Sequence, residues 1–500
     1  MRNKLYFCLA VLLMMGTLSA KGQNVSEPQL VDGYYQIENA EQLKWFRDQV
    51  NRGNVSLNAK LMGDIKLSEL ELNADGTIKG TAPAEQWVPI GSYGNGGADD
   101  FPYCGIFDGQ GHTVSGVYIN TTDNGAKGFI GAIEKRAEVK NLGVVNSYIS
   151  AVDCVGGVCG RADGEDHKEE NGARISNCYF SGVVCATGHD AYVGGICGEN
   201  DDAAKNIDCY NLGLVKAVGD VWAGGICGRN EGSILNCYNT GKVMNEYSSI
   251  GTQVGAICGL NDDVAYAHAV IVDNCYYLDG TAAVGVYKNQ GTVSNVIAKT
   301  AEQFEGGEVA ALLGNAYGQS LSGTKAAGLK STPVLLAFYP EEEQAALKVY
   351  SVIYDLNYEG AAALDTIYGN TGRTIRPLAN VPVREGYSFV GWFDQKEGGT
   401  ELASPSSIGT ADRTFYAHWE KTDDPTALDK VTDSSSGIRV LDGRICITTD
   451  EPVGMRIVSI TGRTVRTGRL AAGTNEISGL PGGVYIVFLD NGTRSKVLIR

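Results

Sequence analysis

Short apolar segments alternate with turns rich in glycine and asparagine through the middle of the chain, from residue 126 to residue 280. The segments are rich in Val, Ile and Tyr, and this pattern is typical of strands. Two blocks recur in step with it. The first is Gly-Gly-x-Cys-Gly, with one Gly-Ala variant, and its cysteines are Cys159, Cys197, Cys227 and Cys258. The second is Asn/Asp-Cys-Tyr, and its cysteines are Cys178, Cys209, Cys237 and Cys275.

The spacing of these blocks predicts a solenoid. The cysteines of the first block are 38, 30 and 31 residues apart. A period near thirty that varies only in its turns indicates stacked rungs, each of which needs a neighbour to bury its apolar face. An earlier copy, KGFIGAIEKRAEVKNLGVV, has Ile130 and Leu142 where the two cysteines would stand. We therefore expect a mainly β chain built around a parallel β-solenoid (β-helix) of roughly 30-residue repeats.

The exchange of cysteine for large aliphatic residues bears on the role of the cysteines. Equivalent residues on stacked rungs lie about 4.8 Å apart, whereas a disulfide prefers a Cβ separation of roughly 3.5–4.5 Å. No pair has the CxxC spacing of a metal site. We expect reduced cysteines that fill the core as small hydrophobic residues. Disulfides between the two cysteine columns stay open as an alternative, because export permits oxidation.

The N-terminus and the overall charge restrict the location and the partners. Arg2 and Lys4 precede an apolar run over 5–15, which predicts a signal peptide over 1–22. No later segment is apolar for long enough to span a bilayer. The formal net charge is −17, so nucleic acid and anionic membranes are poor partners. We expect an exported protein, either at the cell surface (outer membrane) or extracellular.

The repeat blocks resemble a known family. GGICG followed by NCYNTG is similar to the GLUG-motif repeat of bacterial surface proteins, and the resemblance extends over roughly 33–340. It implies an extracellular β-solenoid, which we place at 23–345, with the clearest repeats at 126–280. Asn39 with Gln42, and Thr300 with Gln303, predict capped helices. We expect these helices to cover the ends of the stack.

Two further modules are expected downstream. The stretch VPVREGYSFVGWFDQKEGGTEL and the later FYAHWE resemble the internalin-B-type (Listeria-Bacteroides) repeat, which implies a small β-grasp-like module at 346–420. A polar linker at 421–436 leads to a β-sandwich at 437–500. That last unit resembles the C-terminal sorting domain of type IX secretion substrates. The residues that carry this likeness are Gly462, Gly473, Leu480, Pro481, Gly483, Tyr485 and Lys496.

Two features repeat with the rungs and are candidate sites. Acidic turns follow the first block, and stacked carboxylates could bind Ca²⁺ through Asp201, Asp202, Asp262 and Asp263; a solvated turn is the alternative. Tyrosines follow the second block at Tyr179, Tyr210, Tyr238 and Tyr276. Each lies next to a cysteine and so on the opposite side of its strand. We predict an outward tyrosine column, which either forms a protective surface ladder or contacts a ligand by stacking on sugar rings or docking a protein.

These features predict a non-catalytic, adhesin-like protein that binds an extracellular protein or glycan and needs no cofactor beyond the calcium considered above. The oligomeric state is left open. The alternative is a β-helix enzyme, a polysaccharide lyase or hydrolase. The acidic residues cluster in turns, and no pair of carboxylates at a working separation can be named from the sequence.

Overall fold

The computed structural model describes residues 27–94, 100–164, 167–247, 253–263, 268–321, 332–362, 364, 366–375, 382–421, 437–441, 443–460 and 462–499. The expected signal peptide at 1–22 and all of the linker except Lys421 lie outside these residues. The described chain forms two compact units, each treated by itself below. The first comprises residues up to 355 with 363–377 and 403–415, and the second comprises 356–362, 378–402 and 416–500.

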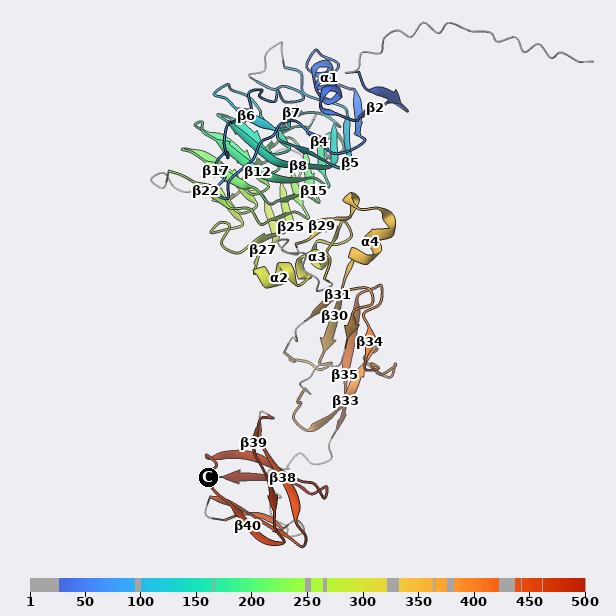
Figure 1. Ribbon diagram of the computed structural model, residues 1–500, viewed down its shortest axis with the longest axis vertical. Coiled ribbons are helices and arrows are strands. Elements are labelled where there is room, and N and C mark those ends of the chain that lie inside the picture. The colour runs from blue at the N-terminus through green and yellow to red at the C-terminus, as the bar shows by residue number, and fades with distance from the viewer. Residues whose placement is uncertain are drawn as a thin grey trace, which may run out of the picture. The chain divides into compact units, whose positions relative to one another are not determined.

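The first unit contains a parallel β-solenoid, as predicted, and its strands stack rung upon rung (Figure 1). One face is a six-stranded parallel sheet of β7 (Ile130–Ile133), β10 (Cys159–Ala162), β14 (Cys197–Asn200), β19 (Cys227–Asn230), β24 (Cys258–Asn261) and β26 (Val286–Asn289). A second face is a four-stranded parallel sheet of β9 (Cys154–Gly156), β13 (Ala191–Gly194), β18 (Val221–Gly224) and β23 (Val254–Gly255).

The remaining solenoid strands form one large sheet, which is parallel except where the first strand, β1 (Gln29–Val31), pairs antiparallel with β2. The other members are β2 (Tyr34–Ile37), β3 (Asn58–Leu61), β4 (Ile65–Lys66), β5 (Ile106–Ser115), β6 (Tyr118–Asn120), β8 (Glu138–Ala151), β11 (Arg174–Ser176), β12 (Tyr179–Ala186), β15 (Lys205–Ile207), β16 (Tyr210–Asn211), β17 (Leu214–Ala217), β20 (Ser233–Leu235), β21 (Tyr238–Asn239), β22 (Val243–Asn245), β25 (Ile271–Leu278) and β27 (Thr292–Lys299).

The cysteines lie inside the solenoid, as predicted. Cys159 pairs in register with Ile130 on one side and with Cys197 on the other, and Cys258 pairs with Val286. The eight cysteines of the two repeat blocks are all 0 % exposed and belong to one continuous core. Among the described residues, these eight cysteines form no disulfide. Cysteine therefore fills the same interior positions as aliphatic residues do on neighbouring rungs.

An asparagine ladder runs beside the first cysteine column. Asn200, Asn230 and Asn261 are fully buried, and the Nδ2 of each donates to the Oδ1 of the asparagine on the next rung at 2.7 Å, ending at Asn289. Each of these asparagines is the last residue of its strand and is buried, so the ladder lies at the point where the strand leads into the acidic turn.

The predicted capping helices form, but only one of them covers an end. In α1 (Ala40–Val50), the Asn39 side chain accepts a hydrogen bond from the Gln42 backbone, and Leu43, Phe46 and Val50 join the solenoid core. Thr300 and Gln303 form a capping box at the start of α2 (Ala301–Glu305). The α2 helix and α3 (Glu308–Leu313) cover the side of the stack, as described below, so their predicted position at its end was wrong.

The first unit continues with short elements after the solenoid. They are β28 (Tyr317–Gly318), β29 (Val334–Leu335), α4 (Glu341–Leu347), β30 (Val349–Asp355), β31 (Ile367–Asn370), β32 (Thr374–Ile375) and β34 (Ser406–Ser407). The β30 and β31 strands pair antiparallel, as do β32 and β34.

The second unit holds one antiparallel strand pair and the C-terminal sandwich. The pair is β33 (Tyr387–Phe393) with the part of β35 (Arg413–Lys421) that begins at Tyr416. The sandwich packs β36 (Ile438–Leu441), β37 (Arg444–Thr449) and β40 (Gly473–Ile477) with a second sheet of β38 (Val453–Ser459), β39 (Thr464–Leu470), β41 (Gly483–Leu489) and β42 (Arg494–Ile499) around one apolar core. The β-sandwich prediction is therefore confirmed.

Candidate binding face

The tyrosine column forms as predicted on the opposite side of the strands from the cysteines. Tyr179, Tyr210 and Tyr238 pair in register, and their rings stack nearly parallel, with centroids 4.9 and 4.7 Å apart. Tyr276 continues the column in register with Tyr238. These rings belong to a cluster separate from the solenoid core.

The prediction that this column is an exposed contact surface was wrong. Tyr210, Tyr238 and Tyr276 are buried beneath Phe304, Val309, Leu313, Tyr317 and Leu335, and the half-buried Tyr179 packs on Phe338. The Tyr238 hydroxyl donates to the Pro333 carbonyl at 2.5 Å. Burial raises the pKa of Tyr179 to about 12. The segment that follows the solenoid therefore covers the column, because an uncovered row of aromatic rings would leave a large apolar surface in water.

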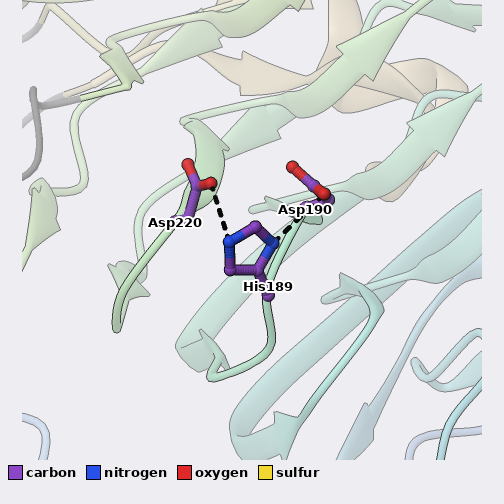
Figure 2. A group of neighbouring side chains, drawn as sticks. All are labelled: His189, Asp190 and Asp220. Carbon is purple, nitrogen blue, oxygen red and sulfur yellow. Dashed lines mark ion pairs between the residues drawn. The ribbon is translucent and has the colours of Figure 1, made fainter.

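The acidic residues proposed as calcium ligands are divided between separate partners. Asp201 pairs with Arg161, Asp262 pairs with Arg229 at 2.7 Å, and the Asp202 carboxylate lies 2.6 Å from Nδ1 of His167. Asp263 is exposed. The structure does not gather these four carboxylates into one ligand group. Within the described ranges, the residues that do form a three-membered group with metal-ligand chemistry are His189, Asp190 and Asp220 (Figure 2).

A second aromatic column remains open on the four-stranded face. The position five residues before each cysteine of the first block stacks from rung to rung, and Tyr192 pairs with Cys154 on one side and with Trp222 on the other. Tyr192 and Trp222 are half-buried, and Tyr287 lies 6.0 Å from Trp222, centroid to centroid. Tyr93 packs with Tyr192 around Cys154. We call Tyr93, Tyr192, Trp222 and Tyr287 the aromatic face.

Cationic side chains flank these rings. Arg161 lies over Tyr93 at 4.1 Å and Arg229 over Tyr192 at 5.6 Å, measured from the guanidinium carbon to the ring centroid. Lys288 lies over Trp222 at 5.5 Å. Because cation–π contacts hold both partners in place, they orient the rings of the aromatic face.

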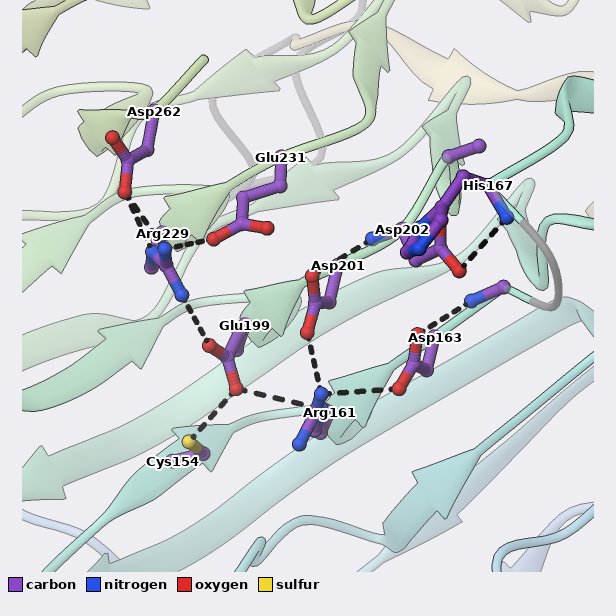
Figure 3. A network of polar contacts seen from close by, with 12 residues as sticks. Cys154, Arg161, Asp163, His167, Glu199, Asp201, Asp202, Arg229, Glu231 and Asp262 are labelled. Carbon is purple, nitrogen blue, oxygen red and sulfur yellow. Dashed lines mark hydrogen bonds and ion pairs between the residues drawn. The ribbon is translucent and has the colours of Figure 1, made fainter. Parts of the chain in front are cut away.

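The two arginines belong to a network that links four rungs, those of β10, β14, β19 and β24 (Figure 3). Glu199 lies between Arg161 and Arg229 in register and contacts them at 3.5 and 3.1 Å. Arg161 also pairs with Asp163 at 3.0 Å, and Arg229 pairs with Glu231. The Cys154 thiol donates to the Glu199 carboxylate at 3.4 Å. We call this set, with Asp201 and Asp262, the arginine–carboxylate network.

The network contains two arginines and five carboxylates, so it has more acidic than basic groups. Burial raises the pKa of Asp163 to about 7 despite its contact with Arg161, and burial also raises the pKa of Glu199. Burial of an ionised carboxylate is unfavourable unless it is fully compensated. The face next to the aromatic residues is therefore a partly desolvated surface with excess negative charge.

A cleft of about 440 Å³ continues the aromatic face toward the N-terminal side. Trp87 and Tyr93 contribute rings to its wall, and Asp123, Asn124 and Lys127 contribute polar groups. Burial lowers the pKa of Lys127, whose ammonium donates to the Asn124 carbonyl at 2.8 Å. Aromatic rings beside polar groups in a concave site are typical of small-molecule binding sites.

Sequence reasoning missed this face, although the repeats contain a signal for it. Aligning the copies on their first cysteine places Cys154, Tyr192, Trp222 and Gln253 in one column and Arg161, Glu199, Arg229 and Leu260 in another. The Cys-Tyr pairs are the more regular signal in the sequence, and they indicated the tyrosine column, which is covered in the structure.

Comparison with known proteins supports the repeat assignments. The GLUG motif matches residues 153–184 and 223–244, and the Listeria-Bacteroides repeat domain matches residues 350–418. The chain is 27% identical over 151 residues to halomucin of Haloquadratum walsbyi, which covers 30% of this chain and 2% of halomucin. It is 35% identical over 57 residues to internalin H of Listeria monocytogenes, which covers 11% of this chain and 10% of that protein. The chain thus spans a small part of each relative.

One solved structure is also similar, a "putative immunoglobulin A1 protease" from Bacteroides ovatus. It is 20% identical, has a TM-score of 0.42, and the match covers 63% of this chain and 93% of that one. By the two family models, the chain carries GLUG motifs and a Listeria-Bacteroides repeat module, and these surface-protein repeats fit an adhesin-like role. Among the helices described, none is long and apolar enough to cross a membrane.

Proposed function

We propose that this chain is an exported, adhesin-like protein that captures an extracellular glycan or protein on the aromatic face without chemical turnover. The observation that carries the proposal is the open column of Tyr192 and Trp222, held by Arg229 and Lys288 on rigid, stacked strands. Aromatic rings supply large contact areas with little loss of side-chain freedom. Rings on two adjacent rungs, with Tyr93 and Tyr287 beside them, favour a ligand that makes several small contacts.

The charge of the face narrows the choice of ligand. Because five carboxylates surround two arginines, anionic glycans and acidic proteins are disfavoured. Neutral glycans are compatible with the face, since they stack on aromatic rings and form hydrogen bonds with carboxylates. A neutral glycan is therefore our first candidate, and a basic protein segment is the second.

A binding array with the full chain tests this function. Trp222→Ala should weaken capture by about 2- to 10-fold, because one aromatic contact contributes on the order of 0.5–1.5 kcal/mol. Tyr247→Ala is the matched control, because Tyr247 is an exposed aromatic residue outside the aromatic face. Equal capture by the wild type and by Trp222→Ala would place the contact elsewhere.

The catalytic alternative rests on Asp163, whose raised pKa would suit a general acid. We favour binding because Asp163 and its neighbours Glu199 and Asp201 are all engaged with Arg161. Incubating the same protein with neutral and acidic polysaccharides, and measuring released reducing or unsaturated ends, decides between the two. Sustained release that Asp163→Asn abolishes would establish an enzyme.

The C-terminal sandwich is proposed as the unit that delivers or attaches the chain at the cell surface. This proposal rests on the motif resemblance of 437–500, within which the Tyr485 hydroxyl donates to the Pro481 carbonyl at 2.8 Å. Fractionation of cells that express a chain lacking 437–500 tests it. Unchanged surface display would mean that the sandwich is not the targeting signal.

A further inference from the structure

A histidine and two aspartates meet where two neighbouring rungs turn into β13 and β18 (Figure 2). Nδ1 of His189 lies 3.1 Å from the Asp190 carboxylate, and Nε2 lies 3.4 Å from the Asp220 carboxylate. One ligand atom from each residue lies within 4.8 Å of the other two. Donor atoms around a metal ion at about 2.1 Å are roughly 3–3.5 Å apart. The histidine ligates through one ring nitrogen, so the carboxylate that faces the other nitrogen must rotate toward it to complete the group.

The strand register explains why a cation is favoured here. Ala191 pairs with Val221, so the preceding residues, Asp190 and Asp220, occupy equivalent positions on adjacent rungs. Like charges directly opposite one another on neighbouring strands are destabilising. In the part of the chain that the structure describes, these two carboxylates form ion pairs with His189. By contrast, arginines bridge the carboxylates of the arginine–carboxylate network that lie on neighbouring rungs. Arg161 contacts Asp163 and Asp201, and Arg229 contacts Glu231 and Asp262.

Exposure also suits an exchangeable ion. The side chains of His189 and Asp190 are 79% and 76% exposed, and that of Asp220 is 23% exposed. An ion can therefore reach the group without any opening of the solenoid. The histidine carries an imidazole nitrogen that can act as a metal ligand.

We propose that His189, Asp190 and Asp220 bind one divalent first-row transition-metal ion, with Zn²⁺ as the representative case. One imidazole nitrogen and two carboxylate oxygens suit such ions better than Ca²⁺ or Mg²⁺, which prefer oxygen alone. Three protein ligands leave coordination positions open to water. Asp190 and Asp220 come two residues before Tyr192 and Trp222, so the ion lies beside the aromatic face. Hydroxyl groups of a captured glycan can replace that water, a step that rests on the proposed function.

Titration of the full chain with Zn²⁺ tests the site directly, by calorimetry on protein without a histidine tag. We expect binding of one ion per chain that His189→Ala and Asp220→Asn each weaken at least about tenfold. His112→Ala is the matched control, because His112 faces a single carboxylate, that of Asp64, at 3.6 Å. Mn²⁺ binding followed by electron paramagnetic resonance excludes a contribution from thiols, which suit softer ions.

Two results would overturn the proposal. One is the absence of saturable binding up to about 1 mM Zn²⁺. The other is unchanged affinity in His189→Ala with its fold confirmed by circular dichroism, since the ion would then be held elsewhere. Glycan capture measured in the presence of a chelator separates this test from that of the proposed function. Capture without Zn²⁺ binding refutes only the metal site, and Zn²⁺ binding without capture on any array refutes only the aromatic face.

Discussion

The solenoid carries two columns of aromatic side chains, one covered and one open. Tyr210, Tyr238 and Tyr276 are buried under the segment that follows the last rung, whereas Tyr192 and Trp222 remain half-exposed. Both columns arise from residues at a repeated position: the covered column has tyrosine on four rungs, and the open column has aromatic rings on two adjacent rungs. The difference shows that the repeat determines where rings stack, and that a segment outside the repeat determines which rings can be reached.

This comparison separates stability from recognition. The covered column makes stacked, desolvated contacts, so its loss should be felt throughout the unit. The open column rests on cation–π contacts at a surface, and such contacts contribute little to folding. The four predictions below compare interior positions of the solenoid with positions at its surface, beginning with the largest expected effect.

Truncating the covered column should be severely destabilising. Tyr238 is 0% exposed, stacks on Tyr210 and donates its hydroxyl to Pro333, so Tyr238→Ala should lower the free energy of unfolding by about 3–5 kcal/mol. Denaturant unfolding of the full chain measures this. The comparison variant is Trp222→Ala, for which we expect a much smaller loss. Equal losses would remove the distinction between the two columns.

One substitution in an interior column should stabilise the protein instead of destabilising it. Asn206 is fully buried between Ile175 and Ile234, in a column that continues to Val272. In the described structure neither of its amide atoms has a hydrogen-bond partner. Asn206→Val should therefore raise the free energy of unfolding by about 1–3 kcal/mol. The reciprocal change Ile234→Asn should lower it in the same assay. A destabilised Asn206→Val would indicate that the amide has a partner in solution.

The arginine–carboxylate network predicts a dependence on pH. Because the folded-state pKa of Asp163 is raised to about 7 from an ordinary value of 3.8, the native state binds more protons between these values, and stability falls as pH rises through them. Near pH 8, Asp163→Asn should have a free energy of unfolding higher than that of the wild type by on the order of 1 kcal/mol, and so a higher melting temperature. The difference should shrink toward pH 5. Melting curves across this range measure the effect. A difference that does not change with pH would mean that Asp163 is ionised throughout.

The cysteine columns should tolerate replacement. Since Ile130 and Val286 occupy the column of Cys227, Cys227→Val should change the free energy of unfolding by less than about 1.5 kcal/mol. Cys227→Asp, which buries a charge at the same place, is the disruptive control. Mass spectrometry of unfolded, alkylated protein should find these thiols free. A full set of disulfides among Cys159, Cys197, Cys227 and Cys258 would contradict their role as packing residues.

Periodicity predicted whatever depends on position within a rung. The parallel stack, the buried cysteines with Ile130 in their column, and the tyrosines on the opposite side of the strand all follow from the spacing of the blocks. The helix caps at Asn39 and Thr300 were also predictable, because a cap depends on residues three positions apart.

Accessibility could not be predicted in this way. The cover over the tyrosines comes from Phe304, Tyr317 and Leu335, which are distant in sequence and carry no repeat signal. The arginines that neutralise Asp201 and Asp262 lie on neighbouring rungs, so the turns appeared more acidic in sequence than they are in space. Burial and charge compensation both depend on contacts between rungs, which a single repeat does not contain.

The asparagine ladder has a direction, and this bears on how the array can change in length. Each amide donates to the asparagine of the next rung, so the first asparagine of the ladder has an acceptor that no other asparagine reaches. That acceptor is Oδ1 of Asn200, whose neighbour on the preceding rung is Ala162. It has no hydrogen-bond partner among the described residues. Inserting or deleting a whole repeat adds or removes one link but leaves the number of such ends unchanged. The unfavourable end is therefore a constant, independent of array length. Duplication of single rungs should accordingly be nearly neutral for the fold, which allows the binding surface to lengthen in evolution one rung at a time.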